Sequence, residues 1–196
     1  MVTVHYPDSL TQTDVSARRL VDWDAARDVA RVTAGLEPDG KAPDSDWIRR
    51  MLLAEHSPIR AVTYLITMTN VPYWVSVHLV RHKVGVEHYV STQRPDRTKS
   101  GVDRHSLPQD APVTHVMVAN AAALIAMSRK RLCNRAAPET QEAWRRVVEA
   151  VRWVDPVMAE FMRPECVYRH GCPEPKSCGG YEKAVGKAIR AGVAVA

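Results

Sequence analysis

The chain has 196 residues, of which 45% are hydrophobic and 25% are charged, the composition of an ordinary globular domain. This length suits one domain with a sizeable core. No apolar run approaches the ~20 residues that span a bilayer, and the first residues lack the basic start and apolar stretch of a signal peptide. We therefore expect a cytoplasmic protein with no membrane partner. The formal charge of +5 favours an anionic partner, and leaves nucleotides, polyphosphate cofactors and nucleic acid open.

The first half of the chain predicts two helices and one strong strand. Residues 2–6 alternate like a short strand, and a capped helical pattern follows over 14–33. A second helix is expected to begin at Asp44 or Ser45, after a loop that contains glycine and proline. The stretch Ala61–Val71 alternates between two faces and is rich in β-branched residues, which makes it the best strand candidate.

The second half of the chain is predicted to be mainly helical, with one extended stretch. In chain order, the predicted elements are a helix over 72–82, an extended stretch over 84–90, a polar loop over 95–112, long helices over 112–132 and 138–161, and a short basic helix over 181–196.

The stretch between Val80 and Arg97 carries the strongest functional signal in the chain. It follows an apolar segment that we expect to be buried, and it is crowded with polar side chains. These are Arg81, His82, Lys83, His88, Ser91, Gln93, Arg94 and Arg97. A cationic loop held on a rigid scaffold suits phosphates and polar heterocycles. The other interpretation of the same residues is a solvated, charged turn without a ligand.

Four short segments stand in the order of the motifs of one enzyme family. They are Ala30-Arg31-Val32-Thr33, Glu55-His56-Ser57-Pro58, Arg81-His82-Lys83 with Ser91 after seven further residues, and Asn134-Arg135 with Gln141 six residues after the arginine. They resemble the Ala-Arg-Val-Ser, His-x-Ser/Thr-Pro, Arg-His-Arg-x7-Ser and Leu-Arg-x5-Gln motifs of the flavin-dependent thymidylate synthases. The resemblance covers about residues 30–170, and the third motif is the most specific.

The chain departs from this family at several positions of the same loop. Lys83 stands where the family has arginine, so a planar two-point fork is replaced by a point charge. His78 stands in place of a glutamine, and His88-Tyr89 in place of Asn-Glu. The end of the motif, Ser91-Thr92-Gln93-Arg94, is one residue longer than in the family. The pattern is that of a divergent, phage-like member.

The resemblance implies a fold, a reaction and an assembly. The fold is α+β, with a mixed or antiparallel sheet flanked by long helices, in a catalytic domain over 1–165 followed by a Cys-containing tail over 166–196. The reaction is reductive methylation of dUMP at C5 to dTMP, with FAD as cofactor and methylenetetrahydrofolate and NADPH as co-substrates. The implied assembly is a homotetramer in which the flavin lies between subunits.

The resemblance also implies roles for individual residues. Arg135 is expected to be catalytic, because a guanidinium beside the uracil favours its polarised, N3-deprotonated form as C5 becomes nucleophilic. The expected substrate-binding residues are His78, Arg81, Ser91, Gln93, Arg94 and Arg135. The expected cofactor-binding residues are Ser57, Arg81, His82, Lys83, Arg129, Asn134 and Gln141. Two structural alternatives stay open: a helix-terminal salt bridge between Arg135 and Glu139, and a core position for His78.

The chain contains four cysteines, Cys133, Cys166, Cys172 and Cys178, and the last three stand at intervals of six. This spacing is longer than the roughly two to four residues usual between paired zinc ligands. Plain thiols, a metal site and disulfide or redox chemistry are all open, and no metal ligand is assigned.

Two other functions are open beside dUMP methylation. The first is a related flavin-dependent modification on the same scaffold, such as 5-hydroxymethylation of dUMP, since the loop residues differ from the family pattern. The second is a basic nucleic-acid-binding module with a Cys cluster, which needs a cationic or aromatic face. The positive charges concentrate around the predicted site instead, so we expect no stable nucleic-acid partner.

Overall fold

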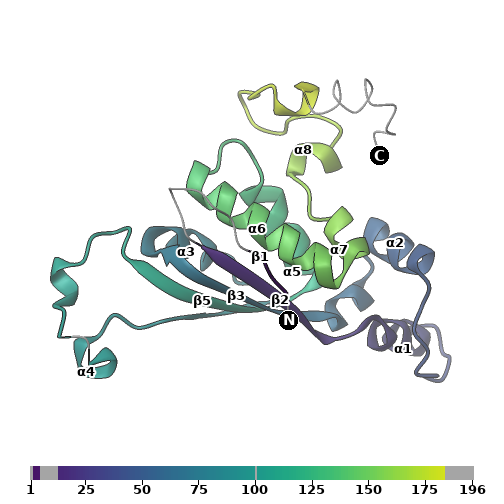
Figure 1. Ribbon diagram of the computed structural model, residues 1–196. Coiled ribbons are helices and arrows are strands. Elements are labelled where there is room, and N and C mark those ends of the chain that lie inside the picture. Colours follow the sequence, from purple (N-terminus) through teal and green to yellow (C-terminus); the bar gives the residue numbers. More distant parts are fainter. Residues whose placement is uncertain (1, 5–12, 100, 184–196) are drawn as a thin grey trace.

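An antiparallel sheet forms the centre of the computed structural model, which describes residues 2–4, 13–99 and 101–183 (Figure 1). Its five strands, within these residues, are β1 (Val2–Val4), β2 (Asp14–Val21), β3 (Thr63–Pro72), β4 (Val86–Val90) and β5 (Pro112–Asn120). The strand order is β1-β2-β3-β5-β4, and each neighbouring pair is antiparallel. The α+β prediction is confirmed, with an antiparallel rather than a mixed sheet.

The long helix α6 packs against β2 and β1 on one face of this sheet, while α4 lies at the outer end of the sheet (Figure 1). The helical elements are α1 (Trp23–Thr33), α2 (Ser45–Ala54), η1 (Ser57–Ala61), α3 (Tyr73–Leu79), α4 (Pro95–Thr98), η2 (Arg104–Ser106), α5 (Ala121–Arg131), α6 (Pro138–Val154), α7 (Pro156–Glu160) and α8 (Glu165–Tyr168). None of the helices in the described part of the chain is long and apolar enough to cross a membrane.

Two sequence predictions are confirmed almost residue for residue. In β3, Tyr64, Ile66 and Met68 are fully buried while the residues between them are partly exposed, so the period-two pattern does separate two faces. The side chain of Asp44 accepts a hydrogen bond of 2.7 Å from the backbone N–H of Trp47 and caps α2.

Two predicted helices are wrong in their first halves, which are strands. Residues 14–21 form β2 and 112–120 form β5, and each pairs with β3 along its length. The helices α1 and α5 begin only afterwards, capped by the side chains of Asp22 and Asn120. Short apolar runs fit a helical and a strand pattern equally well, and here the partner strand decides.

The helix predicted over 138–161 is divided at Asp155. Asp155 has non-helical backbone angles, and its carboxylate accepts from the backbone N–H of Met158 at 3.0 Å, which caps α7. Pro156 stands at the first position of α7, where its missing N–H costs nothing. Of the basic helix predicted over 181–196, residues 184–196 lie outside the described residues, as do residues 5 and 6 of the first predicted strand.

Asp155 also ties the helices to the sheet. Its buried Oδ2 accepts from the indole N–H of Trp23 at 2.6 Å and from the hydroxyl of Tyr64 at 2.7 Å. Arg19 completes the group with a contact of 3.1 Å. A buried carboxylate needs such partners, because an unpaired charge in the core is strongly destabilising. The group joins β2, β3, α1 and α7 around one atom.

Candidate functional site

Arg131, which lies outside the sequence motifs, links the end of α5 to the cationic loop after α3. Its Nη2 donates to the carbonyl oxygen of His78 at 2.6 Å, and its Nε donates to Nε2 of His82 at 3.0 Å. Arg131 closes a run of three cations in the last turn of α5, where the helix dipole favours positive charge. This run of cations is the signal in the sequence that could have pointed to Arg131. The neighbouring sequence does not identify its partners, which come from α3 and the loop after it.

The ring of His82 is neutral in this arrangement. An arginine Nε–H can only donate, so Nε2 of His82 accepts and the ring proton sits on Nδ1. Burial, and then the positive charge of Arg131, lower the pKa of His82 to about 4. A neutral imidazole with a single N–H donor therefore stands between the exposed cations Arg81 and Lys83.

His78 is a half-buried residue that joins α3 to α6. Its Nδ1 lies 2.9 Å from the hydroxyl oxygen of Thr140, and its ring packs edge-on against Trp74 at 5.3 Å between centroids. Burial, Arg131 and Arg81 all lower the pKa of His78. The ring of His78 thus has partners within the protein, as expected if His78 occupies a core position. The contact of His78 with a nucleotide base stays a prediction.

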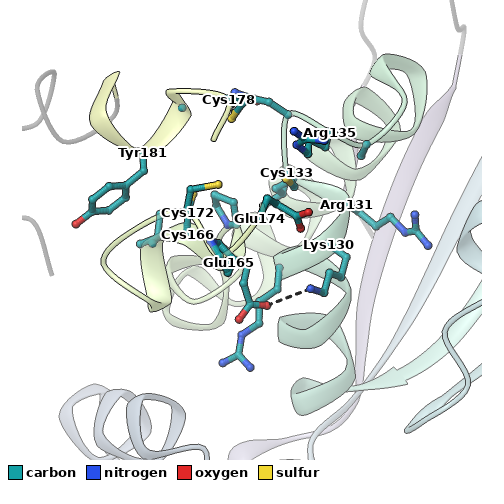
Figure 2. Close-up of a pocket in the computed structure, with 18 residues that line it drawn as sticks. Lys130, Arg131, Cys133, Arg135, Glu165, Cys166, Cys172, Glu174, Cys178 and Tyr181 are labelled. Carbon is teal, nitrogen blue, oxygen red and sulfur yellow. Dashed lines mark hydrogen bonds and ion pairs between the residues drawn. The ribbon is translucent and has the colours of Figure 1, made fainter. Parts of the chain in front are cut away.

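A cavity of about 370 Å³ lies between the α5–α6 connection and the C-terminal segment (Figure 2). Its wall includes Arg129, Arg131, Asn134 and Arg135. Because Arg131 also contacts His78 and His82, the cavity and the cationic loop are neighbours. In Figure 2 the Arg131 side chain points away from Arg135 and the cysteines, so the cavity and the cationic loop lie on either side of Arg131, a residue that was not predicted.

Arg135, the expected catalytic residue, is held by the C-terminal segment. Its Nη2 donates to the backbone carbonyl of Lys176 at 2.7 Å. Within the described residues it forms no ion pair with Glu139, so that structural alternative is not what the structure contains. The guanidinium is exposed and faces a carbonyl oxygen, the kind of group that a uracil also presents.

Gln141 and Asn134 brace the connection that carries Arg135. Nε2 of Gln141 donates to Oδ1 of Asn134 and to the carbonyl of Leu132, each at 3.0 Å. Oε1 of Gln141 accepts from Arg145 at 2.5 Å. The buried amide of Gln141 is thus used within the protein, which supports the loop geometry. The expected contact of Gln141 with a cofactor stays a prediction.

Arg129 is engaged on two sides. It forms an ion pair with Glu55, and its guanidinium lies over the ring of Tyr168 at 4.2 Å from the centroid. Ser57 opens η1 two residues after Glu55 and is exposed. These contacts place Arg129 where α2, α5 and α8 meet, at the edge of the cavity.

Ser91, Gln93 and Arg94 lie elsewhere in the same chain. They line a separate hollow with Tyr73 and Arg104. Figure 1 shows α4, which directly follows Arg94, at the outer end of the arm that carries β4 and β5, far from α8. The expected phosphate-binding residues are therefore not brought to Arg135 within one chain.

Their own contacts are local. The hydroxyl of Ser91 accepts from the backbone N–H of Thr114 at 3.0 Å. The guanidinium of Arg94 makes a two-point contact with Asp96, at 3.0 and 2.7 Å. Both partners of this ion pair are exposed, so the pair holds Arg94 only weakly.

All four cysteines line the cavity as free thiols, Cys133 from the α5–α6 connection and the other three from the C-terminal segment (Figure 2). Burial is the main cause that raises the pKa of Cys166, and the neighbouring cysteines add to it. Cys178 receives a long contact of 3.8 Å from the amide of Asn134. In the part of the chain that the structure describes, no group of three or more His, Cys, Asp or Glu side chains is placed to hold a metal ion.

Comparisons with known proteins identify the fold. No family model and no curated protein matches the chain. A solved structure of the UMP/dUMP methylase PolB from Streptomyces cacaoi, bound with 5-Br dUMP, is similar with a TM-score of 0.60 and 15% identity, over 77% of this chain and 94% of that one. The flavin-dependent thymidylate synthase ThyX from Helicobacter pylori, complexed with FAD and dUMP, is similar with a TM-score of 0.63 and 14% identity, over 76% and 99%.

The chain thus has the fold of the flavin-dependent thymidylate synthases, as the motifs predicted. ThyX and PolB share that fold with it at low identity.

Proposed function

We propose that the chain is a flavin-dependent enzyme that methylates dUMP at C5, with FAD as cofactor and methylenetetrahydrofolate and NADPH as co-substrates. One observation carries the proposal. In a fold shared with a protein bound to FAD and dUMP, Arg131 joins the Arg81-His82-Lys83 motif to the cavity that holds Arg135. The cationic motif and the base-binding candidate Arg135 then lie on either side of Arg131, an arrangement that supports a shared flavin and nucleotide site.

The residues after α3 fit the anionic part of FAD. Arg81 and Lys83 are exposed cations, and the neutral His82 beside them adds one N–H donor without further charge. Cations and N–H donors are what a pyrophosphate binds. When bound, FAD supplies the hydride chemistry that side chains cannot perform. Lys83 meets the pyrophosphate as a point charge, where the family's arginine offers a fork.

Arg135 is assigned to the pyrimidine. Its donor now faces the carbonyl oxygen of Lys176, and a uracil carbonyl presents the same acceptor, so the nucleotide takes the place of that backbone contact. A guanidinium at this edge stabilises negative charge on the ring as C5 becomes nucleophilic. The interaction is then stronger in the transition state than in the ground state.

A second copy of the chain completes the proposed site. The candidate phosphate-binding residues Ser91, Gln93 and Arg94 line a hollow that shares no residue with the cavity of Arg135. Contact between subunits of a homotetramer brings such distant groups together. Arg94→Ala and Arg135→Ala, each expected to be impaired alone, should regain part of the turnover when they are coexpressed in mixed oligomers. Activity no higher than that of the separate variants would place the whole site in one chain.

Two measurements test the function itself. Titration with FAD at the flavin absorbance should reveal binding, and mass spectrometry of the nucleotide product should identify dTMP. A 5-hydroxymethyl product would show that the enzyme hydroxymethylates dUMP instead of methylating it. A folded protein that binds an oligonucleotide and no FAD would refute the proposal.

Arg135→Lys tests the role of the guanidinium. It keeps the charge and loses the planar two-point fit, so turnover should fall more than about tenfold while dUMP affinity falls less. Oxidation of NADPH without nucleotide should persist. Arg152→Lys, an exposed arginine at the other end of α6, is the matched control and should leave turnover unchanged. Unchanged turnover in Arg135→Lys would remove Arg135 from the chemistry.

A further inference from the structure

A pair of histidines lies behind the cationic loop. His115 is fully buried on the face of β5 that also carries Val113 and Met117. Its Nε2 lies 2.9 Å from Nδ1 of His88 on the neighbouring strand β4, and the two rings are nearly perpendicular, with an angle of 77° between their planes. The second nitrogen of His88, Nε2, lies 2.9 Å from the backbone carbonyl oxygen of His82. The pair therefore ends on the cationic loop.

The hydrogen bonds assign one tautomer to each ring. A carbonyl oxygen only accepts, so Nε2 of His88 carries a proton and donates to His82. In the neutral ring, Nδ1 of His88 is then an acceptor, and Nε2–H of His115 donates to it. The buried Nδ1 of His115 has no hydrogen-bond partner in the described part of the chain, so a proton there would be left unsatisfied. The chain of donors runs from His115 through His88 to His82.

His82 is consequently fixed at two atoms. His88 holds its backbone carbonyl, and Arg131 holds its ring at Nε2. Together these contacts set the position of the loop between α3 and β4 and leave the ring proton on Nδ1. A pair of apolar side chains would fill the space behind the loop without the cost of desolvating two imidazoles. The polar pair instead supplies a donor to the backbone carbonyl of His82.

We propose that His88, oriented by the buried His115, is a positioning residue that fixes His82 beside Arg131 in the site for flavin and nucleotide. The proposal rests on the proposed function, because it gives His82 a ligand to meet. His88 acts through His82 and touches no substrate itself.

The test compares three substitutions in β4. His88→Phe keeps a ring and removes both hydrogen bonds, while His88→Gln keeps an N–H that can reach the His82 carbonyl. Tyr89→Phe is the control, since Tyr89 is the next residue, 58% exposed, on the other face of the strand. Nitrogen-15 NMR of the histidine rings, recorded against pH without any ligand, reads the tautomer and the pKa of His82 directly. Isothermal titration then gives the FAD and dUMP dissociation constants.

In His88→Phe, the hydrogen bond to the His82 carbonyl is lost, and the loop can move away from Arg131. Burial and Arg131 are what lower the pKa of His82, so we expect that pKa to rise by about one unit. FAD and dUMP should bind roughly three- to tenfold more weakly. His88→Gln should restore both quantities, and Tyr89→Phe should match the unsubstituted protein. An unchanged His82 titration in folded His88→Phe, or His88→Gln as impaired as His88→Phe, would overturn the proposal.

If His88→Phe does not fold, His115→Leu decides. This substitution removes the donor that orients His88. We then expect the pKa of His82 to rise, but by less than in His88→Phe. An unchanged pKa of His82 would refute the proposal. The ring measurements need no ligand, so they keep this proposal separate from the proposed function. A protein that binds neither FAD nor dUMP, with the tautomers as assigned, would refute the function and the site role while leaving only a structural histidine pair.

Discussion

Gly180 is where the contact between the C-terminal segment and the α5–α6 connection is most sensitive to substitution. A Cβ at this position would lie 2.7 Å from Nδ2 of Asn134 and 3.1 Å from Sγ of Cys178. Side-chain ends often move aside, but Asn134 is held by Gln141, whose amide also binds the carbonyl of Leu132. In Gly180→Ala, we therefore expect the segment to shift away from Asn134 and Arg135. Gly171→Ala is the matched control, because a Cβ there meets nothing within 4 Å.

The size of the effect follows from the crowding. Overpacking by one methyl group costs about 1–3 kcal/mol. We expect about 1–2 kcal/mol here, because both crowded atoms are at the ends of side chains and can move in part. About 1–2 kcal/mol raises the population of the undocked segment roughly 5- to 30-fold. Undocking also releases Arg135 from the carbonyl of Lys176. The apparent affinity for dUMP should therefore increase in Gly180→Ala if the nucleotide competes with that contact.

Alkylation with iodoacetamide, followed by mass spectrometry, measures the undocking. Cys133 is a half-buried thiol on the cavity wall, and its rate should rise several-fold in Gly180→Ala. The rate in Gly171→Ala should equal that of the unsubstituted protein. Equal Cys133 rates in all three proteins would show that Gly180 does not control the docking of the segment that contacts Arg135.

Three further predictions concern the core, the histidines and the phosphate candidate. Asp155→Ala leaves the buried donors of Trp23 and Tyr64 unpaired, so the free energy of unfolding in urea should fall by about 3–5 kcal/mol, and by less in Asp155→Asn; a loss below about 1 kcal/mol would contradict the role of this carboxylate. Burial lowers the pKa of His115 to about 4 from 6.5, so the unfolded chain binds more protons between these values and stability must fall on acidification. Going from pH 7 to below pH 4 should remove about 3 kcal/mol through this residue, and the part of the pH dependence that vanishes in His115→Leu measures it. Arg94→Ala should weaken dUMP about ten- to a hundredfold and deoxyuridine little, whereas Asp96→Asn, which frees Arg94, should strengthen dUMP; equal losses for both ligands would assign the phosphate to another cation.

Local sequence determined the elements whose patterns are unambiguous. The alternation of Ala61–Val71 and the capping carboxylate of Asp44 each depend on neighbours a few residues away, and both predictions are confirmed. The motif residues of the loop after α3 were also recognisable from sequence, because their spacing is short. Such features need no knowledge of what packs against them.

Tertiary structure decided the rest. Residues 14–21 and 112–120 are strands because β3 lies beside them, 40 or more residues away in the chain, and their apolar patterns alone fit a helix as well. The importance of Arg131 comes from the two histidines that α3 and its loop bring to it, and the pairing of His88 with His115 comes from the register of β4 with β5. Hydrogen bonds are specific only once two groups lie within about 3 Å, and folding alone brings distant residues that close.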